Sequence, residues 1–304
     1  MKFKLSPLAT AMVLCVCAHL IPAASAQSTP SLPAPSVVQV PGVERHQLGE
    51  VEVFALSDKR FLIDATRFAK LPQSEWPQAM AQSFKSDPGL QGVTAYAIRW
   101  GSTVVLINAG RGARQGDDLG QVAENLKSAG ISSDEVSAVF LTSLHADQVS
   151  GLLGRDEQRQ FKNAQLYASQ EAMVHWLADH HYVQAPDEQK VSFATTITSV
   201  MPYVKSGKLQ PVETGVSMVP GLSVVSLPGG TPGTVGYLIE SGGHKLLITG
   251  DGTASKADRR RALTQAAKQR WLVADGYVPF PGFERVQVKA GGALSQAPLR
   301  ATVK

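Results

Sequence analysis

Short β-type segments that follow one another without an intervening helix constrain the fold of this chain most strongly. One pair is Val93–Trp100 and Thr103–Ile107, and a second pair, in the other half of the chain, is Val235–Glu240 and Lys245–Thr249. Runs of this kind, rich in β-branched and aromatic residues, predict strands. Since helical patterns separate other strands, the order predicts a mixed α/β sandwich with helices outside the sheets.

The remaining elements are predicted from the same periodicities. The chain is 43% hydrophobic and 18% charged, which is an ordinary globular composition. Further strands are predicted at Val51–Leu56, Ala138–Thr142 and Leu222–Leu227, and helices at Leu119–Ala129, Gln170–Asp179, Lys190–Tyr203 and Ala257–Lys268.

The N-terminal segment has the organisation of a signal peptide. Two lysines precede an apolar run at 8–20, and Ala-Ser-Ala at 24–26 has the form of a cleavage site. A membrane anchor is the weaker interpretation, because the run is shorter than the ~20 residues of a span. We therefore predict a signal peptide at 1–26, a Pro-rich leader at 27–41 and one domain at 42–304, with a periplasmic or secreted location.

Cysteine content and charge exclude several classes of function. Cys15 and Cys17 both lie in the predicted signal peptide, so the mature chain has no thiol for a disulfide or a nucleophile. Without the two signal lysines the formal net charge falls from +4 to +2. That charge is too small to favour nucleic acid or anionic lipid. We expect no nucleic-acid partner and no membrane span.

The segment TSLHADQVSG, Thr142–Gly151, is the candidate site loop. It follows the predicted strand Ala138–Thr142, and irregular backbone at a strand end can turn side chains toward a shared pocket. The chain also contains VLINAG before this loop, the block PGGTPGTVGYLIESGGHKLLITGD after it, and PFPG near the end.

In these blocks the sequence resembles the metallo-β-lactamase superfamily, and within it the exported branch of methyl parathion hydrolase and related lactone and ester hydrolases. The resemblance covers nearly all of the predicted domain and implies an αββα four-layer sandwich. It also implies an ancestral site for two metal ions, in which a bridging hydroxide attacks a carbonyl or phosphoryl centre.

The implied metal-ligand positions carry few ligands in this chain. Only His145, Asp147 and Asp251 have a ligand type that the family uses, and they fall short of the three or four protein ligands of a catalytic zinc ion. The resemblance therefore implies a dismantled dinuclear site, with no cofactor expected. The positions at which the family's ligand is replaced are Ser143, Gln148, Gly230 and Tyr277.

Two further family positions also differ. The usual Asp-Thr-Gly after the second strand is Asn108-Ala109-Gly110 here, and the second His of the Gly-His-Thr-Pro-Gly-His block is Thr234. Such groups orient metal ligands in the family, so their replacement agrees with a relaxed demand for metal.

Three interpretations remain open for the surviving side chains. His145 and Asp147 could be vestiges that bond backbone amides of their own loop. Together with Asp251 they could hold one divalent ion, Zn, Mn or Fe. Without metal, Ser143 could act as a nucleophile with His145 as its base, and Tyr277 is a further catalytic candidate.

Other clusters have simpler interpretations. His175 and His180 lie five apart, so on one helix they would point to different faces and indicate a solvated surface. The run Arg259-Arg260-Arg261 follows Asp258 and is typical of a solvated helix face rather than a phosphate site.

The leading functional hypothesis is an exported, non-hydrolytic protein that binds a small molecule or a protein partner in the former active-site pocket. One alternative is a hydrolase of esters, lactones or organophosphates with a mononuclear or metal-free site. A second alternative is a structural, complex-forming protein.

Overall fold

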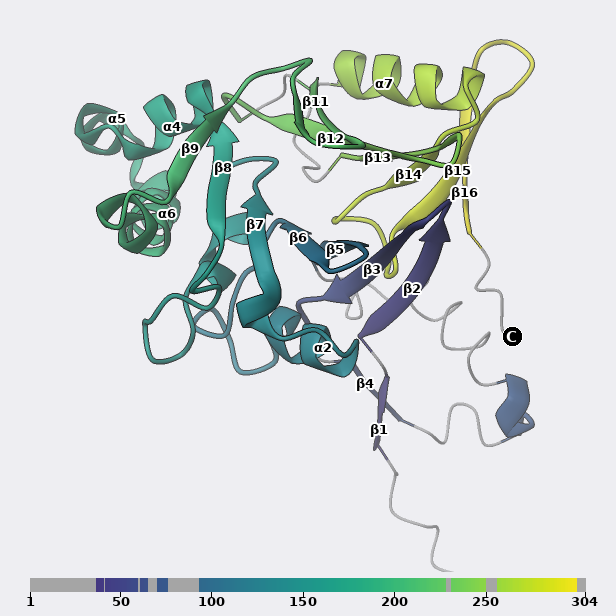
Figure 1. Ribbon diagram of the computed structural model, residues 1–304, viewed down its shortest axis with the longest axis horizontal. Coiled ribbons are helices and arrows are strands. Elements are labelled where there is room, and N and C mark those ends of the chain that lie inside the picture. Colours follow the sequence, from purple (N-terminus) through teal and green to yellow (C-terminus); the bar gives the residue numbers. More distant parts are fainter. Residues whose placement is uncertain are drawn as a thin grey trace, which may run out of the picture. The chain divides into compact units, whose positions relative to one another are not determined.

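Two seven-stranded sheets form the centre of the computed structural model, in agreement with the predicted sandwich (Figure 1). The structure describes residues 37–40, 42–59, 61–64, 70–75, 93–227, 231–249 and 256–299. The predicted signal peptide, most of the predicted leader, Gly230 and Asp251 lie outside the described residues.

The first sheet has the order β2-β3-β5-β6-β7-β8-β9. Strands β2 to β6 pair antiparallel, and from β6 onward the pairing is parallel. The strands are β2 (Val43–Leu48), β3 (Val51–Ser57), β5 (Thr94–Trp100), β6 (Thr103–Ile107), β7 (Val136–Phe140), β8 (Gln165–Ser169) and β9 (Leu209–Val212).

The second sheet runs in sequence order from β10 to β16 and is antiparallel except between β13 and β14. Its strands are β10 (Ser217–Val219), β11 (Leu222–Ser226), β12 (Val235–Ser241), β13 (His244–Ile248), β14 (Leu272–Ala274), β15 (Phe283–Val288) and β16 (Leu294–Pro298). A separate two-stranded sheet joins β1 (Val37–Val40), inside the predicted leader, to β4 (Phe61–Asp64).

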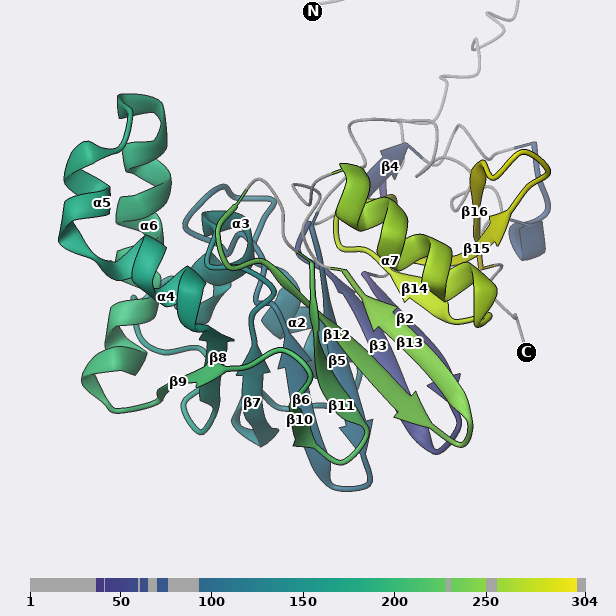
Figure 2. The same cartoon turned by 90° about the horizontal axis from the view of Figure 1, so that it is seen from above.

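Helices lie against the outer faces of both sheets. Helix α7 (Lys256–Lys268) packs on the second sheet, while the others accompany the first (Figure 2). These are α2 (Val122–Ser128), α3 (Ala146–Val149), α4 (Gln170–Leu177), α5 (Asp179–Gln184) and α6 (Asp187–Lys205). Short 3-10 turns occur at Gln73–Glu75, Ser133–Glu135 and Ser150–Leu152. No helix in the described ranges combines the length and apolar character needed to cross a bilayer.

Alternate side chains of the central strands enter two different cores. In β3, Val53 and Ala55 join the core between the sheets, while Phe54 and Leu56 join the core beneath the helices. Burial on both faces is what a sheet with a layer on each side requires. The predicted αββα sandwich is therefore confirmed.

The sandwich fixes the position of the site loop. The Tyr237 hydroxyl, on β12, donates a 2.9 Å hydrogen bond to the carbonyl of Leu141, directly after β7. The amide of Val235 donates to the Thr142 carbonyl over 2.8 Å. Because these bonds join the two sheets, the loop after β7 is held against the second sheet.

Gly151 allows the end of this loop to approach the segment after β6. A Cβ atom at Gly151 would lie 1.9 Å from the carbonyl oxygen of Ala109, whereas one at Gly116 would first meet the side-chain Oδ1 of Asp118 at 3.3 Å. The first contact is with backbone and cannot be relieved by a rotamer change.

We predict that Gly151→Ala lowers the free energy of unfolding by about 1–3 kcal/mol, because the two segments must move apart. Urea denaturation measures this change, with Gly116→Ala as the matched control of little effect. Equal stabilities of the two variants would contradict the close approach.

Candidate functional site

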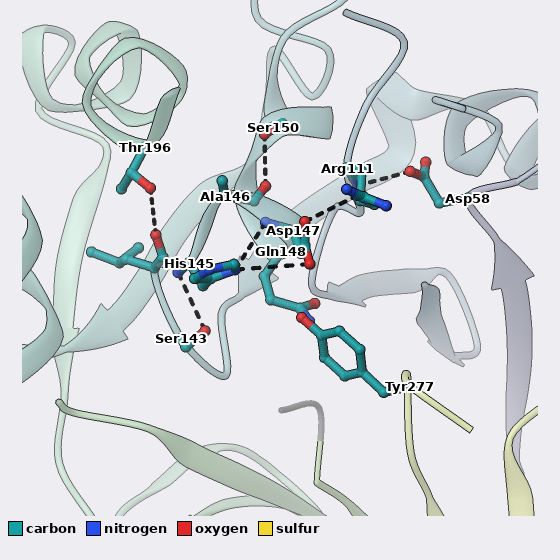
Figure 3. Close-up of polar contacts among 11 residues, drawn as sticks. Asp58, Arg111, Ser143, His145, Ala146, Asp147, Gln148, Ser150, Thr196 and Tyr277 are labelled. Carbon is teal, nitrogen blue, oxygen red and sulfur yellow. Dashed lines mark hydrogen bonds and ion pairs between the residues drawn. The ribbon is translucent and has the colours of Figure 1, made fainter. Parts of the chain in front are cut away.

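The loop after β7 leads into α3, and His145 is the N-cap of that helix. Its Nδ1 accepts a 3.4 Å hydrogen bond from the amide of Asp147, and its carbonyl accepts one of 2.8 Å from the amide of Gln148 (Figure 3). Ser150 Oγ closes the turn by donating to the Ala146 carbonyl. His145 therefore bonds a backbone amide of its own loop, as one of the sequence interpretations proposed.

Asn108 supports this loop from the end of β6. Its Oδ1 accepts hydrogen bonds from the amide and the hydroxyl of Thr142, at 2.9 and 3.0 Å. The residue has a φ of 63°, a conformation that Asn adopts more readily than most residues. The side-chain oxygen at this position thus orients the loop although the residue is not the family's Asp.

Asp58 fixes the segment that follows Asn108. Its Oδ2 accepts hydrogen bonds from the amides of Arg111 and Gly112, at 2.8 and 3.1 Å. Burial raises the pKa of Asp58 to about 7, and hydrogen bonds from nearby backbone amides oppose that rise. Gly110 is required here, because a Cβ atom would lie 2.6 Å from Asp58 Cγ.

The segment held by Asp58 directs Arg111 toward the site. Arg111 Nε lies 3.0 Å from Asp147 Oδ1, and the two side chains are 46% and 26% exposed (Figure 3). The other carboxylate oxygen, Oδ2, is 3.9 Å from His145 Nδ1. Asp147, a predicted residual metal ligand, thus has a guanidinium as its partner. Sequence reasoning missed Arg111, although a basic residue beside Asn108-Ala109-Gly110 could have indicated it.

Gln148 and Tyr277 are in direct contact. Gln148 Nε2 donates a 2.8 Å hydrogen bond to the hydroxyl of Tyr277, and the Gln148 side chain is buried. Tyr277 follows β14, where Asp275 Oδ1 accepts from its amide over 2.9 Å. Asp275 is buried and pairs with Arg259 of α7 over 2.6 Å. Two predicted replacement positions, one from each half of the chain, therefore bond each other.

Ser143 is buried, and its Oγ accepts a 3.3 Å hydrogen bond from the backbone amide of His145. The His145 side chain contacts Asp147 and Trp176, whose ring centroid lies 5.8 Å away. The proposed nucleophile Ser143 is thus bonded to the backbone amide of the proposed base His145. Their catalytic roles remain predictions.

The segment Thr231–Thr234 lies directly before β12. Thr234 Oγ1 donates to the carbonyl of Thr231 over 2.8 Å, which closes a turn. The carbonyl of Gly233 accepts a 2.5 Å hydrogen bond from Ser169 Oγ, which ties the turn to the end of β8. Gly230 and Asp251 lie outside the described residues, so their predicted roles remain predictions.

The donor set in the described part of the site does not fit two zinc ions. Ser143, Gln148 and Tyr277 present an alcohol, an amide and a phenol, which are weak ligands at neutral pH. Asp147 is engaged by Arg111. Within the described ranges, no three or more His, Cys, Asp or Glu side chains are grouped to hold a metal ion.

Comparisons with known proteins agree with the fold. The family model described as the Metallo-beta-lactamase superfamily matches residues 88–292. No match was found among curated protein sequences. Among solved structures, the hydrolase AbOPH of the β-lactamase superfamily is similar with a TM-score of 0.72 and 23% identity, covering 86% of this chain and 99% of its own.

Two further structures have the same arrangement. The dizinc quorum-quenching lactonase AidC, solved with its product, has a TM-score of 0.68 and 20% identity, covering 85% of this chain and 98% of its own. A probable metal-dependent hydrolase from Staphylococcus aureus has a TM-score of 0.60 and 16% identity, and the match covers 85% of this chain and 100% of the hydrolase. At these identities the likeness is one of fold.

The buried carboxyl of Asp58 makes the stability of the folded protein depend on pH. Its pKa in the folded protein, about 7, lies above the ordinary value of 3.8. The folded state therefore binds this proton more tightly, so the contribution of Asp58 to stability is full below pH 3.8 and is lost as the pH rises through about 7.

We expect the stability of the wild type relative to Asp58→Asn to decrease between pH 5 and 8, since the amide does not titrate. Urea denaturation across that range measures it, with the exposed Asp187→Asn as a control. A constant difference between wild type and Asp58→Asn would disprove the titration.

Proposed function

Because the chain belongs to the metallo-β-lactamase superfamily, we propose that it keeps the fold of a hydrolase but binds a small molecule or protein partner without hydrolysing it. The proposal includes export, with residues 1–26 as a signal peptide. It also places the chain near the methyl parathion hydrolase and lactonase branch, whose metal ligands it has replaced.

The observation that carries this proposal is the hydrogen bond between Gln148 and Tyr277. Both side chains stand at positions where the family resemblance implies metal-binding histidines. Here the amide and the phenol are partners of each other over 2.8 Å. A contact of this length leaves no room for an ion between the donor and the acceptor atoms, so the pair suits a metal-free site.

The ion pair between Arg111 and Asp147 supports the same conclusion. A metal ion would neutralise the carboxylate in an active member of the family, whereas the guanidinium supplies the positive charge here. Binding an ion to Asp147 would require this pair to open. The partly exposed side chains of Arg111 and His145 are then free to meet a ligand on their solvent side.

A hollow at the turn before β12 offers space for a small molecule. It has a volume of about 350 Å³ and adjoins the turn that follows position 230. Volumes from roughly 300 Å³ upward are typical of ligand pockets. Its lining includes Ser169, Glu171, Glu213, Thr214, Ser226 and the segment from Thr231 to Val235.

Metal retention and hydrolysis test the proposal together. The wild-type chain is equilibrated with zinc, manganese and iron, dialysed exhaustively and analysed by plasma mass spectrometry, and then assayed on a lactone, an aryl ester and a phosphotriester. We predict far less than one retained equivalent and no turnover above buffer, because the donor set does not satisfy a catalytic ion.

Matched variants decide the interpretation. The quadruple variant Ser143→His, Gln148→His, Gly230→His, Tyr277→His restores the implied ligands and should retain zinc after the same dialysis. Retention of metal by the wild type that disappears in His145→Ala, with turnover that falls in parallel, would overturn the proposal in favour of a reduced hydrolase.

A further inference from the structure

A break in the helical hairpin beside the site brings two histidines together. In the sequence HWLADHHY, His175 and His180 were expected to point to different faces if they lay on one helix. In the structure α4 ends at Leu177 and α5 begins at Asp179, because Ala178 is extended, with φ −86° and ψ 126°. The chain turns, and the rings of His175 and His181 come within 5.1 Å between centroids. The single-helix assumption was wrong.

The surroundings hold this pair in place. The ring of His175 also packs on Phe193 of α6, with a centroid distance of 5.3 Å. Both His175 and His181 are half-buried, while His180 is exposed with its ring 4.1 Å from that of His181. The pair therefore presents two ordered imidazoles at the surface of the helical hairpin.

The electrostatic surroundings of His175 favour its neutral form. Burial lowers the pKa of His175, the neighbouring His181 lowers it further, and Glu171 acts in the opposite direction. A lowered pKa keeps the imidazole neutral near pH 7, and the neutral ring is the form that binds metal. Glu171 lies one turn earlier on α4, where a carboxylate can orient a ligand histidine.

We propose that His175 and His181 form a binding site for a divalent transition-metal ion that prefers imidazole ligands, with Cu²⁺ bound more tightly than Zn²⁺. Metal–nitrogen bonds of about 2 Å place two imidazole centroids on a shared tetrahedral ion roughly 5 Å apart, which matches the observed 5.1 Å. The preference for copper follows the general order of affinity among these ions.

The site is open rather than enclosed. The described residues hold no group of three candidate ligands. The ion is therefore bound by two protein ligands, and solvent completes its coordination. An ion held in this way exchanges readily and is removed by dialysis, unlike one in a closed structural site. The ring of Trp176 contacts both His175 and His145, at centroid distances of 5.3 and 5.8 Å, and within the described residues no group of three candidate ligands joins His145 to the pair.

Cu²⁺ titration of the full chain tests the proposal. Electron paramagnetic resonance should show one equivalent bound with two nitrogen ligands, and competition with a chelator gives the Kd. We expect His175→Phe and His181→Gln each to raise the Kd at least tenfold. The His175→Phe substitution keeps an aromatic ring packed against Phe193, and circular dichroism checks the fold. His244→Ala, an exposed histidine on β13, is the matched control.

A wild-type Kd for Cu²⁺ in either His175→Phe or His181→Gln would overturn the proposal. A raised Kd in His244→Ala, with unchanged values in the hairpin variants, would also overturn it. Loss in both hairpin variants with an unchanged Kd in His244→Ala supports it. A His145→Ala chain should bind copper normally. Metal bound at the histidine pair is lost in His175→Phe and His181→Gln, whereas metal retained at the loop after β7 is lost in His145→Ala, so the two proposals fail in different variants.

Discussion

Burial of the first sheet on both faces is the constraint on which the rest of the structure depends. Val53 and Ala55 face the second sheet while Phe54 and Leu56 face the helices, so β3 is apolar on both sides. Such a strand is stable only with a layer on each face. The two sheets must therefore lie face to face, which brings the loop after β7 to the segment that follows β14.

That arrangement explains the contacts at the candidate site. The family resemblance implies that it brings metal ligands together from both halves of the chain. Here the same positions hold Gln148 and Tyr277, which bond each other, and Asp147, which pairs with Arg111. Removal of ligands from such a site would otherwise leave buried polar groups without partners, at a cost in stability. The bond between Gln148 and Tyr277 gives the Gln148 amide N–H group and the Tyr277 hydroxyl a partner in each other, and it joins segments that follow strands of the two sheets.

Much of the fold could be predicted from the sequence, because the central strands have strong patterns. The predicted segments Thr103–Ile107 and Val235–Glu240 agree with β6 and with all but the last residue of β12. Short strands such as β9 and β14 were missed, because three or four residues carry little periodicity. The family resemblance supplied the layers, which agree with the structure.

The site was predicted less completely than the fold. The sequence indicated that Ser143, Gln148 and Tyr277 are poor ligands, since that follows from residue type. It could not indicate that Gln148 contacts Tyr277, which lies 129 positions later and depends on the packing of the sheets. The sequence also could not indicate the ion pair between Arg111 and Asp147, because the position of Arg111 depends on the hydrogen bond from its backbone amide to the buried Asp58. The meeting of His175 and His181 was missed because the break at Ala178 has no Gly or Pro to mark it.

The central claim is that the replaced ligand positions are partners of each other whether or not metal is present. A double-mutant cycle between Gln148→Met and Tyr277→Phe tests it most directly, with unfolding free energies measured in chelator and in excess zinc. We expect a coupling of about 1 kcal/mol, as for a buried hydrogen bond, that is the same in both conditions. A coupling near zero, or one that appears or disappears on addition of zinc, would contradict the claim.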